Sequence, residues 1–423
     1  MKQKILLIFS GLFFTFQAKC LQLLIPMDDT QKDHLKSYGI AYWALEKDIE
    51  VKWLLNYRGG SFLMQHYPEI ENECTIRGVS YETISDARAN GILNEIAQPD
   101  VNQDAVSMNK APGIAVYSPP NKQPWDDAVT LVLTYAEINY DVIYDEEIVN
   151  GKLSEYDWLH LHHEDFTGQF GKFWRTYQHY PWYQQDVKIN NELAQKLGFL
   201  KVSEMKSFVS REIEKYVQNG GFLFAMCAAT DTYDISLAAT GIDICQPMFD
   251  GDPMDPDADA KLDFKRTFAF EDFKLEKDPN VYEFSNIDAT QTRSTVHHVV
   301  RENDFFTLFE FSAKWDPIPT MLCQNHRNLI KGFMGQTTAY RKEVLKSNVL
   351  VMGENKPANE ARYIHGEKGK GFWTFYGGHD PEDYQHLIGD PPTDLSLHPN
   401  SPGYRLILNN ILFPAAKKKK RKT

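Results

Sequence analysis

The chain has 423 residues, of which 42% are hydrophobic and 13% aromatic, and its formal net charge is −13. This composition supports a packed core and excludes a largely disordered chain. The negative charge argues against general binding to nucleic acid, which attracts basic surfaces. Four cysteines after residue 20 are too few for a disulfide scaffold in a chain of this length.

Residues 1–20 have the pattern of a signal peptide. A basic start, MKQK, precedes the apolar run Ile5–Phe16, which is too short to span a membrane. Ala18 and Cys20 favour cleavage after Cys20, and lipidation of Cys20 is the alternative. We therefore expect an exported protein, periplasmic or associated with the cell envelope, with no transmembrane span in the mature chain.

Residues 21–105 read as a small N-terminal α/β unit. Buried-strand runs at 21–26 and 49–57 enclose a helix capped near Asp28 and Thr30. The segment 101–112 has few large apolar residues and reads as a linker.

Residues 106–416 form a second and longer α/β series. Strands are predicted at 114–120, 140–145, 157–163 and 222–226, with helices at 125–138 and 203–217 between them. This alternation predicts a doubly wound parallel sheet. An irregular insertion is expected near 245–320, two further strands at 360–378, and a disordered basic tail at 417–423.

A cysteine stands directly after the most apolar strand. Residues 220–232 read GGFLFAMCAATDT, so Cys227 occupies the turn from strand 222–226 into a helix. Small residues two positions away on each side, Ala225 and Ala229, suit the tight backbone of a nucleophile elbow. The helix dipole beginning there favours a thiolate. A structural core cysteine remains the alternative interpretation.

A thiol nucleophile requires a base, and the segment YGGHDPEDY supplies His379 after a strand and two glycines. Asp380 and Glu382 follow it and are the candidates for the acid that orients the imidazole. The backbone N–H of Ala228, with another from the loop that holds His163 and Glu164, is the expected oxyanion hole.

The strand series from IAVYSP to GKGFWTFYGGHD, together with the Cys227 elbow, resembles the class I glutamine amidotransferase-like superfamily and is closest to its ThuA-like branch. The resemblance covers roughly residues 113–383 and implies a flavodoxin-like fold. It also implies Cys227 as nucleophile and His379 as base. The chain departs from the His-x-Glu pattern, since Pro381 follows at the second position and Glu382 at the third, and it has alanines where the elbow usually has glycines.

The whole chain, from IPMDD to SLHPNSPGYRLILNN, also resembles an exported Bacteroidota family labelled asparagine synthetase B. The motifs do not support that label as chemistry. Enzymes of that name have a catalytic cysteine after Met1 and an SGGxDS loop, whereas this chain has Lys2 and, at Arg58–Ser61, RGGS without the aspartate.

A competing site lies in HLHHED at the end of the strand 157–163. Strand alternation puts His160 and His162 on one face, where they could hold a divalent metal together with His379 and Glu382. A polar pocket lining is the alternative interpretation.

Two hypotheses follow. The first is a cysteine-dependent amidase or related hydrolase that needs no cofactor and acts on a small-molecule amide. The second is a non-catalytic or metal-dependent ThuA-like module that binds a sugar or cell-envelope glycan. The sequence gives no indication of oligomeric state.

Overall fold

The computed structural model describes residues 21–121, 124–289, 304–323, 327–333, 335–384 and 388–416. The expected signal peptide, Cys20 and the basic tail at 417–423 lie outside the described residues. No helix in the described part of the chain is long and apolar enough to cross a membrane. The four described cysteines, Cys74, Cys227, Cys245 and Cys323, are all buried free thiols.

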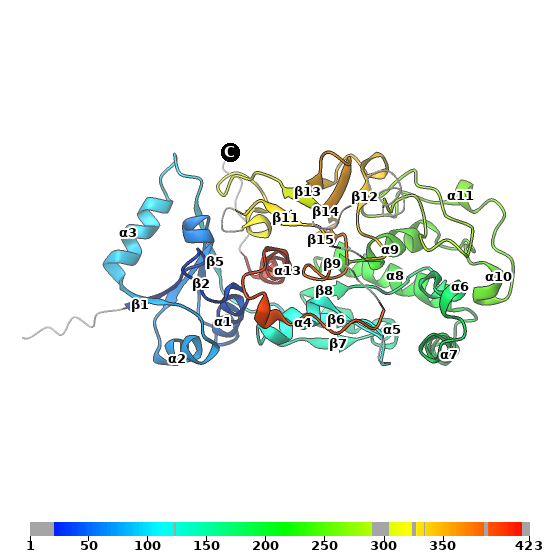
Figure 1. Ribbon diagram of the computed structural model, residues 1–423, viewed down its shortest axis with the longest axis horizontal. Helices are drawn as coiled ribbons and strands as arrows, with labels where there is room; N and C mark the ends of the chain where they lie inside the picture. Colours follow the sequence, from blue (N-terminus) through cyan, green and yellow to red (C-terminus); the bar gives the residue numbers. More distant parts are fainter. Residues whose placement is uncertain are drawn as a thin grey trace, which may run out of the picture.

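The N-terminal unit, blue in Figure 1, is a five-stranded antiparallel sheet with helices packed on it. Its elements are β1 (Leu21–Ile25), α1 (His34–Glu46), β2 (Val51–Leu55), β3 (Ser61–Gln65), α2 (Pro68–Arg77), β4 (Glu82–Ser85), α3 (Asp86–Ile96) and β5 (Asp104–Met108). The strand order is β4-β1-β3-β2-β5. Leu23 and Ile25 pack with α1, whereas Leu24 between them packs with α3, so both faces of β1 are covered.

Strand β5 corrects the prediction of a linker over 101–112. It pairs with β2 at the edge of the N-terminal sheet. Only Val106 and Met108 of this strand are buried, because its other face is partly open. A short edge strand with two buried residues has too weak an alternation to be recognised from sequence.

The larger unit is built on a ten-stranded mixed sheet, in the order β11-β10-β13-β14-β15-β9-β8-β6-β7 with β12 paired to β14. Its strands are β6 (Ile114–Tyr117), β7 (Asp141–Ile143), β8 (Trp158–Leu161), β9 (Phe222–Met226), β10 (Phe305–Leu308), β11 (Leu329–Lys331), β12 (Tyr340–Arg341), β13 (Leu350–Asn355), β14 (Glu360–Lys368) and β15 (Gly371–Tyr376). The pairings from β15 through β9, β8 and β6 to β7 are parallel, and those on the β14 side are antiparallel. The α/β prediction is confirmed, but the sheet is mixed and not wholly parallel.

Helices cover both faces of this sheet. They are α4 (Ala128–Tyr135), α5 (Asp145–Val149), α6 (Trp174–Tyr177), α7 (Pro181–Lys196), α8 (Val202–Gln218), α9 (Ala229–Ala238), α10 (Pro247–Asp250), α11 (Ala258–Lys261) and α13 (Pro402–Leu412). Along β9, Phe222, Phe224 and Met226 share a core with α1, α4 and α13. Leu223 and Ala225 share the opposite core with α5, α8 and α9. In the expected insertion near 245–320, the described helices and strands are all short.

The two units share a continuous core. Helix α13 lies between the two sheets in Figure 1 and contacts both α1 and α4. Arg405 on α13 donates to the carbonyl of Gly59 at 2.7 Å, and the Tyr38 hydroxyl of α1 donates to Asn409. The N-terminal unit therefore buttresses the face of the larger sheet that carries α4.

Candidate functional site

Four neighbouring parallel strands end at one edge of the larger sheet, in the order β15-β9-β8-β6. His379 follows β15, Cys227 follows β9, and His162 and His163 follow β8. The loop after β6 leads to Asp126 and Asp127 at the start of α4. Because ligands gather at the carboxyl ends of parallel strands, this edge is the candidate active site.

Cys227 forms the turn between β9 and α9 in a left-handed backbone conformation, with φ of +50°. This conformation is uncommon and strained for any residue with a side chain. The Cys227 N–H donates to the Gly378 carbonyl at 3.1 Å, and the Ala229 N–H donates to the His162 carbonyl at 3.0 Å. The elbow is therefore tied by hydrogen bonds to both flanking loops.

The sulfur of Cys227 lies beneath the segment 335–338. The side chain is 1% exposed, and the backbone N–H of Gln336 donates to Sγ across 3.4 Å. Burial raises the pKa of the Cys227 thiol to about 11, although hydrogen bonds from the backbone N–H groups of Gln336, Thr337 and Ala228 partly oppose it. The sequence-based expectation that the helix dipole favours a thiolate is thus wrong for this conformation, because desolvation outweighs it.

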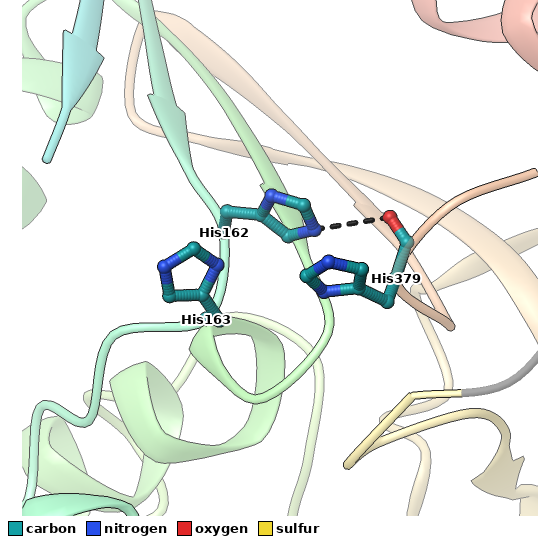
Figure 2. Close-up of side chains that lie close together, drawn as sticks. All are labelled: His162, His163 and His379. Atoms are coloured by element: carbon teal, nitrogen blue, oxygen red, sulfur yellow. Dashed lines mark hydrogen bonds between the residues drawn. The ribbon is translucent and has the colours of Figure 1, made fainter. Parts of the chain in front are cut away.

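The imidazole of His379 lies in a cluster with His162 and His163 (Figure 2). Its ring stacks on that of His162 with centroids 4.4 Å apart, and it lies 5.8 Å from the ring of His163. Its Nε2 is 3.3 Å from Oδ1 of Asp126. Burial alone would raise the pKa of Asp126, but the hydrogen bond and charge of His379 lower it, so Asp126 is a carboxylate that accepts from Nε2–H. In the neutral ring, Nδ1 is then the nitrogen that can accept a proton.

The two acids predicted to orient His379 bond other groups. Glu382 accepts from the hydroxyls of Tyr384 at 2.7 Å and Ser401 at 2.5 Å. Asp380 accepts from the backbone N–H of Glu382 at 2.8 Å, and burial raises the pKa of its carboxyl. Among the described residues, the carboxylate that faces the imidazole is Asp126. The sequence feature that points to Asp126 is its position just before the helix that follows β6. Strand β6 is one of the parallel strands that end at this edge of the sheet.

Asp127 is the second carboxylate in contact with histidines at this edge, and its partners are His160 and His162. Its Oδ2 is 3.3 Å from Nε2 of His160 and 3.1 Å from Nδ1 of His162, so both histidines do lie on one face. Burial lowers the pKa of His160. For His162, burial also acts to lower the pKa, but the charge and hydrogen bond of Asp127 and the charges of Glu164 and Asp126 together raise it. Burial opposes the ionisation of Asp127, but the two imidazoles hold its pKa well below its usual range. The ionised form of Asp127 is therefore favoured, and its charge in turn favours the protonated form of His162.

The histidine cluster has the residue types of a metal site. His162, His163 and His379 each offer a nitrogen, and these three atoms lie within 4.8 Å of one another. However, His162 uses Nδ1 toward Asp127 and Nε2 toward the carbonyl of His379 at 3.0 Å. A carbonyl only accepts, so that Nε2 carries a proton and cannot ligate until this bond breaks. His163 and His379 fit a metal better than His162 does.

His163 and Glu164 line a pocket beside the cluster. Nε2 of His163 is 3.8 Å from Oε1 of Glu164. Burial, followed by the nearby charge of Asp127, raises the pKa of Glu164 to about 7. The pair thus connects the cluster to this pocket.

No family model and no curated protein matches the chain. Among solved structures, it is similar to the cytoplasmic protein STM3548 from Salmonella typhimurium, with a TM-score of 0.36, 10% identity, and coverage of 73% of this chain and 100% of that one. It is also similar to the cytoplasmic protein STM1381 from Salmonella typhimurium LT2, with a TM-score of 0.34 and 11% identity. That match covers 72% of this chain and 100% of the other. A third similar structure is the exo-β-1,4-mannosidase Op5Man5 from Opitutaceae bacterium strain TAV5, with a TM-score of 0.31 and 10% identity. That match covers 73% of this chain and 37% of the other. Likenesses this remote indicate nothing about activity.

Proposed function

We propose that this protein is an exported hydrolase of amide bonds, of the glutamine amidotransferase-like class with a flavodoxin-like larger unit. Cys227 is its nucleophile, His379 its base, and Asp126 the acid that orients the base. The observation that carries the proposal is the left-handed conformation of Cys227, at φ +50°, between the loops that bear His162 and His379. A strained, non-glycine residue at the end of a central parallel strand is the geometry of a nucleophile elbow.

The proposed reaction has two stages. In the first, His379 takes the thiol proton, sulfur attacks the amide carbon, and the C–N bond breaks as the amine leaves with that proton. In the second, water attacks the resulting thioester and releases the acid and the thiol. The N–H of Ala228, the N-cap residue of α9, is a donor for the oxyanion of both stages.

Burial determines how the thiol must be activated. With a pKa of about 11, Cys227 is protonated at neutral pH, so no preformed thiolate supports the reaction. Activation therefore requires proton transfer to a base in the attacking step, as in serine hydrolases. Asp126 supports this role because it holds the Nε2–H of His379 and directs Nδ1 to accept the proton.

The experiment is site-resolved alkylation of the folded protein by iodoacetamide at neutral pH, with mass spectrometry of each cysteine peptide. Cys74, Cys245 and Cys323 are also buried free thiols and serve as internal controls. We expect Cys227 to react at least about tenfold faster than these three, because the loop that bears the proposed base His379 is hydrogen-bonded to the Cys227 backbone. His379→Ala should remove this difference.

If Cys227 reacts no faster than Cys74, Cys245 and Cys323, or reacts only after unfolding, the proposal is wrong and Cys227 is a core residue. Circular dichroism of His379→Ala establishes that the variant is folded. A rate that is unchanged in His379→Ala would exclude His379 as the base.

The second candidate is a metal-dependent, ThuA-like module, and the observation that favours it is the convergence of the three histidine nitrogens within 4.8 Å. A divalent ion there would supply a Lewis acid for a bound oxygen. Titration calorimetry with Zn²⁺ tests it: one tight site that is lost in His163→Ala but kept in His66→Ala supports this candidate. His66 is the control because it bonds Glu71 in the N-terminal unit.

A further inference from the structure

The pocket beside the histidine cluster has aromatic walls. It is formed by the loop after β8, the start of α7 and the segment that precedes α4, and Trp125, Phe173 and Trp182 line it. The ring of Trp125 lies 5.3 Å from Phe173 and 5.4 Å from Trp182. Such walls accept apolar groups and exclude water from whatever they enclose.

The pocket is small. It encloses about 50 Å³, which exceeds the roughly 10–15 Å³ that a cavity needs to hold one water. It is also far below the roughly 300 Å³ at which sites begin to enclose a whole drug-sized ligand. We therefore read it as a pocket for one substituent of a larger molecule.

Most polar groups in its wall are already bonded. Asp165 accepts from Thr167 and Gly171, and Lys206 donates to Asp145 at 2.8 Å. The hydroxyl of Tyr144 donates to Asn190 at 3.0 Å. These groups already make hydrogen bonds within the protein, so they leave little hydrogen-bonding capacity for a ligand.

Among the lining residues, Trp125 and Glu164 retain that capacity. Within the described residues, the indole Nε1 of Trp125 is buried without a hydrogen-bond partner, and so is Oε1 of Glu164. Glu164 is 7% exposed, and its other oxygen accepts from the backbone N–H of His162 at 3.1 Å. A buried polar atom without a hydrogen-bond partner is destabilising, so a ligand that pairs with both atoms would be favoured.

These two groups flank His163. The indole of Trp125 packs edge-on against the His163 ring at 5.2 Å, and Oε1 of Glu164 is 3.8 Å from its Nε2. The His163 ring lies 5.8 Å from that of His379. A group held in this pocket would thus lie against His163, whose ring is a neighbour of the proposed catalytic base.

One N–H donor, one carboxyl oxygen as acceptor and an aromatic wall match a single small group. We propose that this pocket binds the acetamido group of an N-acetylated amino sugar. Its carbonyl oxygen accepts from Trp125 Nε1, its N–H donates to Glu164 Oε1, and its methyl contacts the aromatic wall. This inference rests on the proposed function, since it names the substrate class of that hydrolase.

The aromatic residues that lead out of the pocket favour a sugar as the molecule that carries the acetamido group. Trp182 packs against Tyr177 at 5.2 Å, and Tyr177 packs against Tyr180 at 5.3 Å. Tyr180 is 51% exposed. This series of rings offers apolar faces on which the C–H face of a pyranose packs, beginning at the pocket and ending at the surface.

The experiment is titration calorimetry of the wild-type protein with N-acetylglucosamine, glucosamine, glucose and N-acetyl-lysine amide. We expect N-acetylglucosamine to bind at least about tenfold more tightly than the other three. Trp125→Phe keeps a ring and removes the N–H, and should weaken N-acetylglucosamine binding about tenfold, as for one lost buried hydrogen bond. Trp315→Phe is the matched control, because Trp315 is 68% exposed.

Equal binding of glucose and N-acetylglucosamine, or no binding of any sugar, overturns the inference. Equal binding of N-acetyl-lysine amide overturns its sugar part. The comparison among ligands needs no variant, so it stands even if Trp125→Phe does not fold. Alkylation of Cys227 is measured without sugar, and therefore the hydrolase proposal and this inference can fail separately.

Discussion

The Nε2 atom of His379 lies 3.3 Å from Oδ1 of Asp126, although 253 positions separate these residues in the chain. Asp126 reaches this place because it follows β6 and His379 follows β15, two parallel strands of one sheet. The contact identifies which acid holds the candidate base. It also makes the roles of three nearby carboxylates distinguishable by mutation.

Asp126→Asn should slow alkylation of Cys227 at neutral pH by about tenfold or more, because an amide at this position neither fixes the His379 tautomer nor stabilises its protonated form. The same rate measurement on Glu382→Gln and Asp380→Asn decides between the acids. A larger effect in either of those two variants would show that the sequence-based assignment was right and the Asp126 contact incidental.

Gly378→Ala should destabilise the fold more than an ordinary left-handed glycine does. Gly378 has φ of +102°, and a Cβ there would lie 2.4 Å from the ring of Phe333. Gly251 is the matched control, with φ of +96° and open space around its Cβ. In urea unfolding we expect a cost of about 1–2 kcal/mol for Gly251→Ala and a clearly larger one for Gly378→Ala. Equal losses of stability in the two variants would mean that the Phe333 ring can move away from the new Cβ at little cost.

Acid should destabilise the protein through His365, a fully buried histidine in β14. Burial lowers its pKa from 6.5 to about 3. Between these values the unfolded chain binds a proton that the folded protein does not, so the stability present above pH 6.5 is lost as the pH falls. From pH 6.5 to 5 the loss from this group is about 2 kcal/mol. Urea unfolding of wild type and His365→Gln over this range measures it; an identical pH dependence in the variant would contradict the prediction.

Lys206 and Asp145 form a buried ion pair, with exposed fractions of 3% and 0%. Removal of one partner leaves a buried charge, so Lys206→Met should cost about 3–5 kcal/mol in thermal or urea unfolding. The double variant with Asp145→Leu should recover much of this loss, since no charge then remains. A double variant that is no more stable than Lys206→Met would show that the hydroxyls of Tyr117 and Tyr144 hold the network together.

The sequence by itself determined the local features. The apolar run of β9 followed by Cys227 between small residues predicted the elbow, and the Gly-Gly-His ending placed His379 after β15. Alternation put His160 and His162 on one face, where both meet Asp127. These patterns are readable because each depends on residues within about one turn or strand of each other.

Only the tertiary structure decided the rest. Which carboxylate faces His379 depends on strand order, which no local pattern encodes. The pKa of Cys227 depends on the segment 335–338 that covers the sulfur, and desolvation there exceeds the local helix dipole that the sequence shows. The pocket at Trp125 and Glu164 joins segments that follow different strands. Chemistry at this edge is set by burial and by long-range proximity, and both arise only when the sheet assembles.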